Sequence, residues 1–466
     1  MKCGFINEKG LRMRSYITGI LFFFTALSKP ACAQNCSAAQ NYALNRPGVV
    51  MIKTVFSANV TVNKMRMDER VFNRLLDSIQ RVDTAGAIFT AEQKLDIVLK
   101  EMNNRPARFF KKSFDNIEQS QQITATGTGF FITGDGYVAT NCHLIDRDNA
   151  FVRRQFILTA FQQITQANIN AFESSWAAKF NDQQKTLLYD TYASVYSKLF
   201  PMTLSDLKKT VYVVYRKDTG TTQTTESKAA NIIIKGLPMP GKDIAVLKID
   251  ADTNLPVLKI APEELPKVGE QLFVYGYPGP VTNNDYVSAE SAIEPTLTTG
   301  IVSAIKKSVN GWPVIQMDAN INHGSSGGPV CNNKGEVVGL TTFGSLENSG
   351  GLAAGLNFSI PVSILNEFLD SAGIEADISK ATIIFAEALD CFDKHYYKKA
   401  LHHFEEIKKL NPNYPTIEIY IADCKTRIAN KEDVGNDNLK YILTAIGIAL
   451  FLVLVFFLFR RMKSAK

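Results

Sequence analysis

The chain has 466 residues, of which 45% are hydrophobic, 10% aromatic and 21% charged. This length leaves room for roughly two or three domains with apolar cores, and the composition excludes an intrinsically disordered chain. The net charge is +6, but part of this excess lies in short basic segments at the two ends of the chain. A nucleic-acid-binding domain with a basic surface patch is therefore not predicted.

The first 33 residues have the organisation of a targeting segment. Basic residues at positions 2–14 precede an apolar run over 17–27, and the small-residue pattern Ala-Cys-Ala follows. This order is typical of a secretory signal peptide, so we predict cleavage at the end of segment 1–33 and export of the remaining chain. The alternative is a lipoprotein signal with lipidation at Cys32 or Cys36, but the Lys-Pro dipeptide before the first of these cysteines fits that processing poorly.

Strand patterns alternate with helical patterns over the next part of the chain. A stretch over 47–61, rich in Val, Ile and Thr, predicts a first strand, and two β-type runs around a Gly-Asp-Gly turn predict a strand pair over 123–139. Apolar residues at helical spacing predict helical insertions near 64–115 and 149–207. We hypothesise that the second insertion acts as a lid.

The segment 210–360 is dense in short β-type runs separated by Gly, Asn and Pro, which predicts a closed or sandwiched all-β unit. Together with the earlier strands it defines a mainly β domain over 34–370. The pattern then becomes helical over 376–430, and a short polar linker follows over 431–440.

An uncharged apolar stretch over 441–459 precedes a basic tail over 460–466. Its length is close to the ~20 residues that a helix needs to cross a bilayer, so we predict one C-terminal transmembrane helix. The positive-inside rule places the tail in the cytoplasm and the folded domains on the periplasmic or extracellular side. A cell-wall sorting signal is the alternative, but no Leu-Pro-x-Thr-Gly box precedes this stretch.

Two of the seven cysteines lie in the predicted signal peptide, and the remaining five are an odd number, so at least one thiol stays unpaired. Cys391 and Cys424 lie on successive predicted helices and are candidates for a bridge. Cys142 and Cys331 are candidates for a redox pair, although small buried thiols are common in β cores. The spacing of Cys and His residues does not match a metal site, and no metal is predicted.

Three short motifs contain the residue types that a serine needs for acyl transfer: a hydroxyl, an imidazole base, a carboxylate that orients the base, and N–H donors for the oxyanion. His143 follows a strand-like run, Asp243 precedes the run Ile-Ala-Val-Leu-Lys, and Ser326 lies in the loop Gly-Ser-Ser-Gly-Gly-Pro. We predict that Ser326 is the nucleophile, His143 the general base and Asp243 its orienting carboxylate. The backbone N–H groups of Gly324 and Ser326 would form the oxyanion hole.

Each of these assignments has a simpler alternative. His323 is the other histidine of the β domain, Asp250 and Asp252 are further carboxylates near the same run, and a Gly-rich loop alone can be an ordinary turn. The joint occurrence of the three motifs favours the catalytic interpretation.

The motifs and their order, His then Asp then Ser, resemble the trypsin-like serine proteases, and in particular the Deg-type (HtrA-like) branch. The runs YGYPG at 275–279, TTGIVS at 298–303 and NFSIP at 357–361 are similar to that branch as well. The resemblance covers roughly residues 124–361 and implies a trypsin-like double β-barrel, here with helical insertions.

The resemblance also implies a strand that pairs with substrate and helps to form the primary specificity pocket, with Thr341, Thr342, Phe343 and Gly344 as the substrate-binding residues. Two features depart from the family pattern: 100 residues separate the predicted base from its carboxylate, and no PDZ-like segment follows the β domain. Regulation by a PDZ domain is therefore not implied.

The helical segment 376–430 resembles a single tetratricopeptide (TPR) repeat followed by one more helix. The matching small and aromatic positions are Ala388, Phe392, Tyr397, Ala400, Phe404 and Pro412. Since roughly three repeats are needed for an independent solenoid, this TPR-like module either docks on the β domain or forms a stalk, and it is a candidate site for a protein partner.

These observations predict a serine endopeptidase that hydrolyses peptide bonds of protein substrates outside the cytoplasm through an acyl-enzyme on Ser326. The resemblance implies no metal or organic cofactor, and the expected partners are protein or peptide substrates and the membrane, not nucleic acid. The alternative is a catalytically latent scaffold with a protease fold that binds protein partners at the membrane. An esterase would differ only in substrate.

Overall fold

The computed structural model describes residues 36–86, 88–219, 222–251, 253–279, 286, 288, 294–346, 352–435 and 437–463, and in this part of the chain two closed β-barrels form the centre of the molecule. The strand order is β1-β2-β3-β6-β5-β4 in the first barrel and β10-β11-β12-β9-β8-β7 in the second. The predicted double barrel with helical insertions is thereby confirmed. The strands are β1 Val49–Met67, β2 Phe110–Phe131, β3 Tyr137–Thr140, β4 Thr203–Thr219, β5 Thr222–Lys235, β6 Ala245–Ile249, β7 Gln271–Gly276, β8 Thr296–Lys307, β9 Pro313–Met317, β10 Pro329–Cys331, β11 Val337–Leu346 and β12 Leu352–Pro361.

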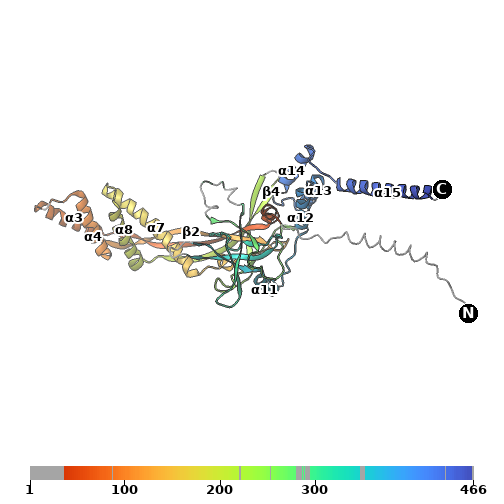
Figure 1. Cartoon of the computed structure of the whole chain (residues 1–466). Coiled ribbons are helices and arrows are strands. Elements are labelled where there is room, and N and C mark those ends of the chain that lie inside the picture. The colour runs from red at the N-terminus through yellow and green to blue at the C-terminus, as the bar shows by residue number, and fades with distance from the viewer. Residues whose placement is uncertain are drawn as a thin grey trace.

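Three strands of the first barrel continue well beyond it as a ribbon (Figure 1). β1 has 19 residues and β2 has 22, and they pair antiparallel from Val49↔Phe130 to Met67↔Phe110. β4 pairs with the other edge of β1 as far as Thr61↔Thr203. At about 3.3 Å per residue, β1 alone is roughly 60 Å long.

A helical head lies at the far end of this ribbon from the barrels (Figure 1). Both predicted insertions contribute to it, and their apolar side chains share one buried cluster that includes Leu95, Met102, Phe172 and Tyr192. The intervals 64–115 and 149–207 are therefore parts of one packed unit. Its helices are α3 Glu69–Thr84, α4 Ala91–Asn104, α5 Pro106–Phe109, α7 Asn149–Trp176, α8 Asp182–Ser194 and the short π-helix η3 Val195–Leu199.

The long helix α7 lies along the ribbon and connects the head to the barrel. Val152, Phe156 and Ala160 are spaced four residues apart, so they share one helix face, and this face packs on Phe56 and Val60 of β1. Apolar residues spaced four apart on the helix thus pack against apolar residues at every second position of the strand.

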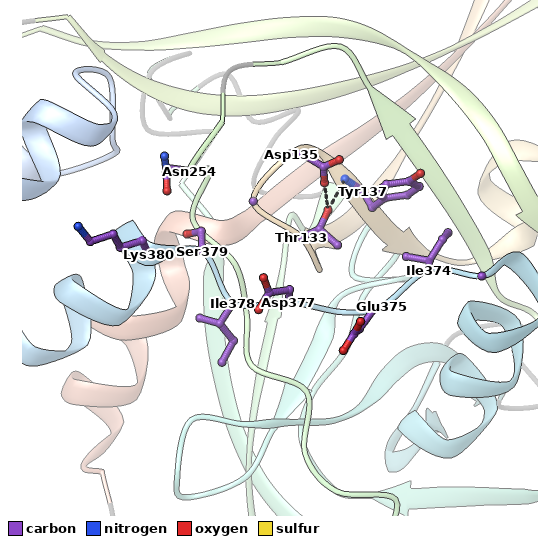
Figure 2. A pocket seen from close by; sticks show the side chains of 12 residues that line it. Thr133, Asp135, Tyr137, Asn254, Ile374, Glu375, Asp377, Ile378, Ser379 and Lys380 are labelled. Carbon is purple, nitrogen blue, oxygen red and sulfur yellow. Dashed lines mark hydrogen bonds between the residues drawn. The ribbon is translucent and has the colours of Figure 1, made fainter.

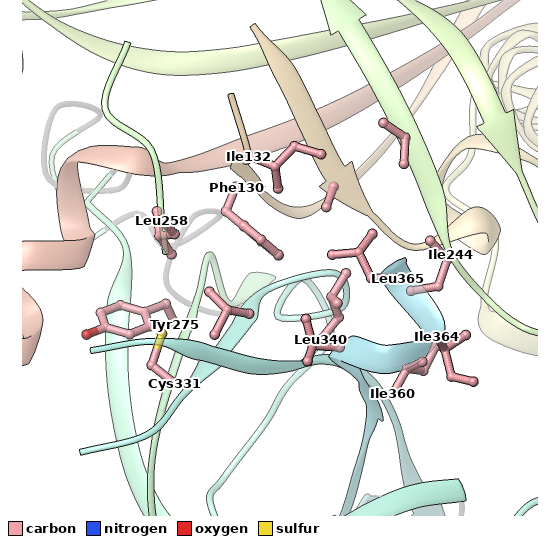
Figure 3. Close-up of a cluster of buried hydrophobic side chains, with 14 of the residues drawn as sticks. Phe130, Ile132, Ile244, Leu258, Tyr275, Cys331, Leu340, Ile360, Ile364 and Leu365 are labelled. Carbon is pink, nitrogen blue, oxygen red and sulfur yellow. The ribbon is translucent and has the colours of Figure 1, made fainter. Parts of the chain in front are cut away.

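The two barrels meet across a continuous apolar core (Figure 3). Phe130 and Ile244 come from the first barrel, Leu340 and Ile360 from the second, and each is fully buried. Leu365 adds a helix, α11 (Val362–Ala372), to the same cluster. This shared core fixes the two barrels relative to each other, so loops at the seam between them are held in a defined geometry.

The TPR-like module consists of α12 (Lys380–Asp393), α13 (Tyr397–Leu410) and α14 (Ile417–Ala429). It docks on the β domain: Ser379 Oγ donates to Leu255 O at 2.7 Å, and Val257 N donates to Thr382 Oγ1 at 2.9 Å. Removing one partner of such a buried hydrogen bond costs about 1–3 kcal/mol, so these two bonds stabilise the docked position of the module. The docked arrangement, not the stalk, is therefore observed, whereas the tetratricopeptide relationship itself stays a prediction.

The connection into this module follows the surface of the first barrel (Figure 2). Thr133 in the β2–β3 turn forms a parallel bridge with Asp377, and a pocket of about 430 Å³ at this junction is lined by Asp135, Glu375 and Asp377 among others. The N-terminal helix α2 (Ala38–Asn45) also packs against the cluster formed by α12–α14. It continues through the 3-10 turn η2 (Arg46–Gly48) into β1.

Helix α15 (Asp437–Lys463) follows the module and begins inside the predicted linker. Among the residues whose structure is described, no helix has both the length and the apolar character needed to cross a membrane. The predicted span over 441–459 is therefore not confirmed. The predicted signal peptide, 1–33, and the last residues of the basic tail, 464–466, lie outside the described residues.

Candidate active site

His143 and Asp243 are brought together by the pairing of β3 with β6. Thr140, at the end of β3, pairs with Ala245, at the start of β6, so the residues that follow one strand and precede the other lie at the same end of the barrel. His143 lies in the short helix α6 (Cys142–Ile145). Its Nδ1 donates to Asp243 Oδ2 at 2.6 Å, and its backbone N–H donates to Oδ1 at 2.8 Å.

Asp243 is held rigidly in this position. Its side chain is 1% exposed, whereas that of His143 is 32% exposed, so the carboxylate lies behind an accessible imidazole. Thr342 Oγ1 also donates to Oδ2 at 3.0 Å, and Asn141 Nδ2 donates to the Asp243 carbonyl at 2.8 Å. A carboxylate can only accept hydrogen bonds, so this geometry requires the proton on Nδ1 and leaves Nε2 free to accept one.

Ser326 lies in the loop between β9 and β10, and Thr128 of the first barrel fastens this loop across the seam. Thr128 N donates to Ser326 O at 2.8 Å, and its hydroxyl donates to Gly324 O at 2.7 Å. Gly324 and Gly327 have φ of 98° and 80°, values that favour glycine, and a Cβ at either position would collide with backbone oxygen atoms. The glycines therefore permit the close approach that positions Ser326.

Two backbone amides of this loop are available to a ligand. Within the described part of the chain, the N–H groups of Gly324 and Ser326 donate to no other group, whereas Ser325 N donates to Asn322 O and Gly327 N to Thr341 O. Paired donors of this kind are the elements of an oxyanion hole. The Ser326 hydroxyl donates to Thr342 O at 3.2 Å.

A pocket of about 430 Å³ contains the predicted catalytic residues. His143, Asp243 and Ser326 all line it, and the other lining residues are Arg147, Pro238, Met239, Ile321, Asn322, His323, Thr342 and Gly344. The structure therefore brings the three predicted catalytic side chains into one cavity. Of the two alternative carboxylates, Asp250 is not among the lining residues, and Asp252 lies outside the described residues.

The four predicted substrate-binding residues on β11 have different positions. Thr342 and Gly344 line the pocket, whereas Thr341 is fully buried and its hydroxyl donates to Ser325 O beneath the nucleophile loop. Phe343 pairs with Phe358 in the strand ladder, and its side chain lies outside the described residues.

Thr128, Asn141 and Thr342 support the site in ways that were not predicted. Each hydroxyl or amide bonds to a residue distant in the chain, so no local pattern identifies the contact. Thr128 does lie within the predicted strand pair over 123–139, and Thr342 within the predicted substrate strand. Their types and approximate places were visible in the sequence, but their bonding partners were not.

The second helical insertion does not cover the site. No residue of 149–207 is among the described residues that line the catalytic pocket, and α7 instead packs along the ribbon. The lid hypothesis is therefore not supported by this arrangement.

The five cysteines of the described chain, Cys36, Cys142, Cys331, Cys391 and Cys424, are all free, so neither candidate bridge is formed. Burial, followed by the charges of Asp243 and Asp146, raises the pKa of Cys142 to about 11. Burial also raises the pKa of Cys331. These thiols are therefore not poised as nucleophiles. Within the described residues, no cluster of His, Cys, Asp and Glu is arranged to hold a metal ion.

The raised pKa of Cys142 predicts slow alkylation in the folded protein. At pH 8 about one in a thousand Cys142 side chains is thiolate, so we expect iodoacetamide to modify Cys142 at least about 100-fold more slowly before unfolding than after it. The rate should rise as the pH approaches 11. Mass spectrometry of timed samples measures this, with the partly exposed Cys36 as the internal comparison. Equal rates at the two thiols in folded protein would contradict it.

Each barrel contributes a different part of the site at the seam between them. The first barrel supplies an imidazole–carboxylate pair, and the second supplies a serine loop with two backbone amides that donate to no described group. This combination defines a trypsin-like serine hydrolase domain. The trypsin-like peptidase domain family matches residues 127–340, a range that contains all three predicted catalytic residues. Residues 127–340 are thus similar to the trypsin-like peptidase domain family.

Curated serine endoproteases are similar to this chain over about 30% of its length. A probable periplasmic serine endoprotease DegP-like from Halomonas elongata is 36% identical over 141 residues, which cover 30% of this chain and 27% of the relative. The serine endoprotease DegS of Haemophilus influenzae is 34% identical over 156 residues, which cover 30% of this chain and 42% of that protein. The serine endoprotease from Yersinia pestis superimposes with a TM-score of 0.34 at 18% identity, covering 72% of this chain and 66% of that one, which is too weak to extend the assignment. The chain thus spans less than half of the length of these two curated relatives.

Proposed function

We propose that the protein is a serine endopeptidase that hydrolyses peptide bonds of protein substrates outside the cytoplasm. The observation that carries this proposal is the arrangement of the seam: the Asp243–His143 pair and Ser326 share one pocket, and the N–H groups of Gly324 and Ser326 in the serine loop donate to no described group. The relatives described as serine endoproteases support the reaction class, and the word periplasmic in the name of one of them supports the location, as does the predicted signal peptide.

In the proposed reaction, His143 Nε2 takes the proton of Ser326 Oγ as that oxygen attacks the scissile carbonyl carbon. The carbonyl oxygen becomes an oxyanion and accepts hydrogen bonds from the N–H groups of Gly324 and Ser326. His143 then gives its proton to the leaving amine, which releases one product and leaves an acyl-Ser326 ester. Water, deprotonated by His143, hydrolyses the ester and restores the free serine.

One observation favours a second candidate, a latent scaffold with a protease fold. The Ser326 hydroxyl donates to Thr342 O in this structure, so its proton points to a backbone carbonyl and not to the base. Catalytic hydrogen bonds are often made only when substrate is bound, so the orientation of the Ser326 hydroxyl in this structure is compatible with catalysis. We therefore place the scaffold second.

Labelling with a fluorophosphonate probe tests the proposal. The solubilised full-length protein should react covalently with the probe, and mass spectrometry should place the adduct on Ser326, because only an activated serine beside a base attacks phosphorus at a useful rate. Heat-denatured protein should not react. An unlabelled native protein that also fails to cleave casein would instead support the scaffold.

A further inference from the structure

The catalytic pocket contains one permanent cation that the proposed chemistry does not use. Arg147 lies four residues after the base, in the short connection between α6 and α7, and it lines the same cavity as His143 and Ser326. Neighbouring residues desolvate its guanidinium enough to lower the pKa of that group, but the residue as a whole is exposed to solvent. An exposed cation can meet an anionic ligand at little desolvation cost, and each such ion pair gives a modest gain in binding.

The carboxylates near Arg147 are already engaged. Asp146 pairs with Lys235, and its other oxygen lies 3.7 Å from Lys209 Nζ. The Asp148 side chain accepts from Ala150 N at 2.8 Å and caps α7. Among the described residues no carboxylate forms an ion pair with Arg147, so its charge is available to a ligand.

The rest of the pocket does not oppose an anion. Asp243 is the one carboxylate among the described residues that line it, and this side chain is almost completely buried and accepts from both His143 and Thr342. Asn322 and His323 are polar neighbours that can donate hydrogen bonds, and Met239 and Ile321 supply apolar walls. The accessible permanent charge of the cavity is therefore positive.

We propose that Arg147 is a specificity-determining residue that binds a carboxylate of the peptide substrate close to the bond attacked by Ser326. The proposal rests on the proposed endopeptidase function and adds a substrate class to it. Arginine offers a planar pair of N–H donors that matches a carboxylate in a bidentate geometry. The carboxylate comes either from an Asp or Glu side chain near the scissile bond or from the C-terminus of the substrate.

For each enzyme variant, the test measures the ratio of kcat/KM between a substrate that has the carboxylate and a matched substrate that lacks it. Wild type and Arg147→Gln digest a library of peptides derived from a denatured proteome, and mass spectrometry identifies the cleaved bonds. Matched synthetic pairs with Glu or Gln at the preferred position, each with a free or an amidated C-terminus, then give kcat/KM. We expect wild type to prefer the carboxylate-bearing member about fivefold, the limit for a partly exposed ion pair. The pair that differs at the side chain and the pair that differs at the C-terminus distinguish the two sources.

Two further variants make the result decisive. Arg147→Glu should favour Lys or Arg at the position where wild type favours an acid, a reversal that loss of packing would not produce. Arg154→Gln removes the same charge from an exposed position on α7 that does not line the pocket, and it should keep the wild-type ratio. An Arg147→Gln ratio equal to that of wild type, with Ser326 still labelled by the fluorophosphonate, would overturn this proposal alone. Absence of both labelling and hydrolysis in wild type would overturn the endopeptidase function, and the specificity proposal with it.

Discussion

Replacement of Ser326 by alanine is expected to lower the rate of peptide hydrolysis by about a millionfold and to abolish fluorophosphonate labelling. The side chain provides the oxygen atom of the proposed acyl-enzyme, and Ser326 is the only serine among the described residues that line the pocket with His143. The fold should persist, because the Ser326 hydroxyl makes one hydrogen bond of 3.2 Å and the loop is held by backbone contacts to Thr128. Hydrolysis of casein, followed together with circular dichroism, measures both expectations.

Ser325→Ala is the matched control for this variant. Ser325 is the adjacent serine of the same loop, but its side chain is buried and accepts only a long hydrogen bond of 3.4 Å from Asn322 N. We expect Ser325→Ala to keep its activity within about tenfold, since it loses neither the nucleophile nor an oxyanion donor. If Ser325→Ala were inactive and Ser326→Ala retained activity, Ser325 would be the nucleophile and the assignment of Ser326 would be wrong.

The positions of the three proposed catalytic residues could be predicted because each lies in a short local pattern. His143 and Asp243 flank strands whose apolar runs are visible in the sequence, and the pairing Thr140↔Ala245 brings their ends together. Ser326 lies in a glycine-rich loop whose positive φ values only glycine adopts readily. Local composition therefore determines both the residue types and the backbone that presents them.

The ribbon could not be predicted in the same way. The outer part of β2, KKSFDNIEQSQQ, is mostly polar and lacks the alternation of a half-buried strand, yet it pairs with β1 on both sides of a register shift at 113–115. The partner strand stabilises this segment. The residues of the segment alone therefore do not predict a strand. Helical patterns in 64–115 and 149–207 likewise indicated two insertions, but nothing local indicated that they share one core.

Supporting contacts at the site depend on the same long-range geometry. Thr342 was predicted to face substrate, and it lines the pocket, but its hydroxyl also binds the carboxylate that orients the base. The sequence analysis did not single out Arg147, and only the fold shows that it shares a cavity with Ser326. Residues that act through tertiary contacts are thus the ones that sequence patterns miss.

Asp243→Asn is expected to lower kcat by about 10⁴-fold while the protein stays folded. In the native site both carboxylate oxygens accept: Oδ1 from His143 N, and Oδ2 from His143 Nδ1 and Thr342 Oγ1. An asparagine must place its NH₂ group at one of these positions. If the NH₂ faces the imidazole, Nδ1 becomes the acceptor, the ring proton moves to Nε2, and the base can no longer take the proton of Ser326.

Asp250→Asn provides the control, because it makes the same chemical change in an exposed carboxylate at the other end of β6. We expect wild-type kcat for this variant, together with slow fluorophosphonate labelling of Asp243→Asn, since Ser326 and the oxyanion donors are still present. A loss of 10⁴-fold corresponds to about 5.4 kcal/mol of transition-state stabilisation, far more than the free energy of a surface ion pair. If Asp243→Asn retained more than about a tenth of wild-type kcat, orientation of His143 would have to depend on other contacts, and the proposed role of Asp243 would be wrong.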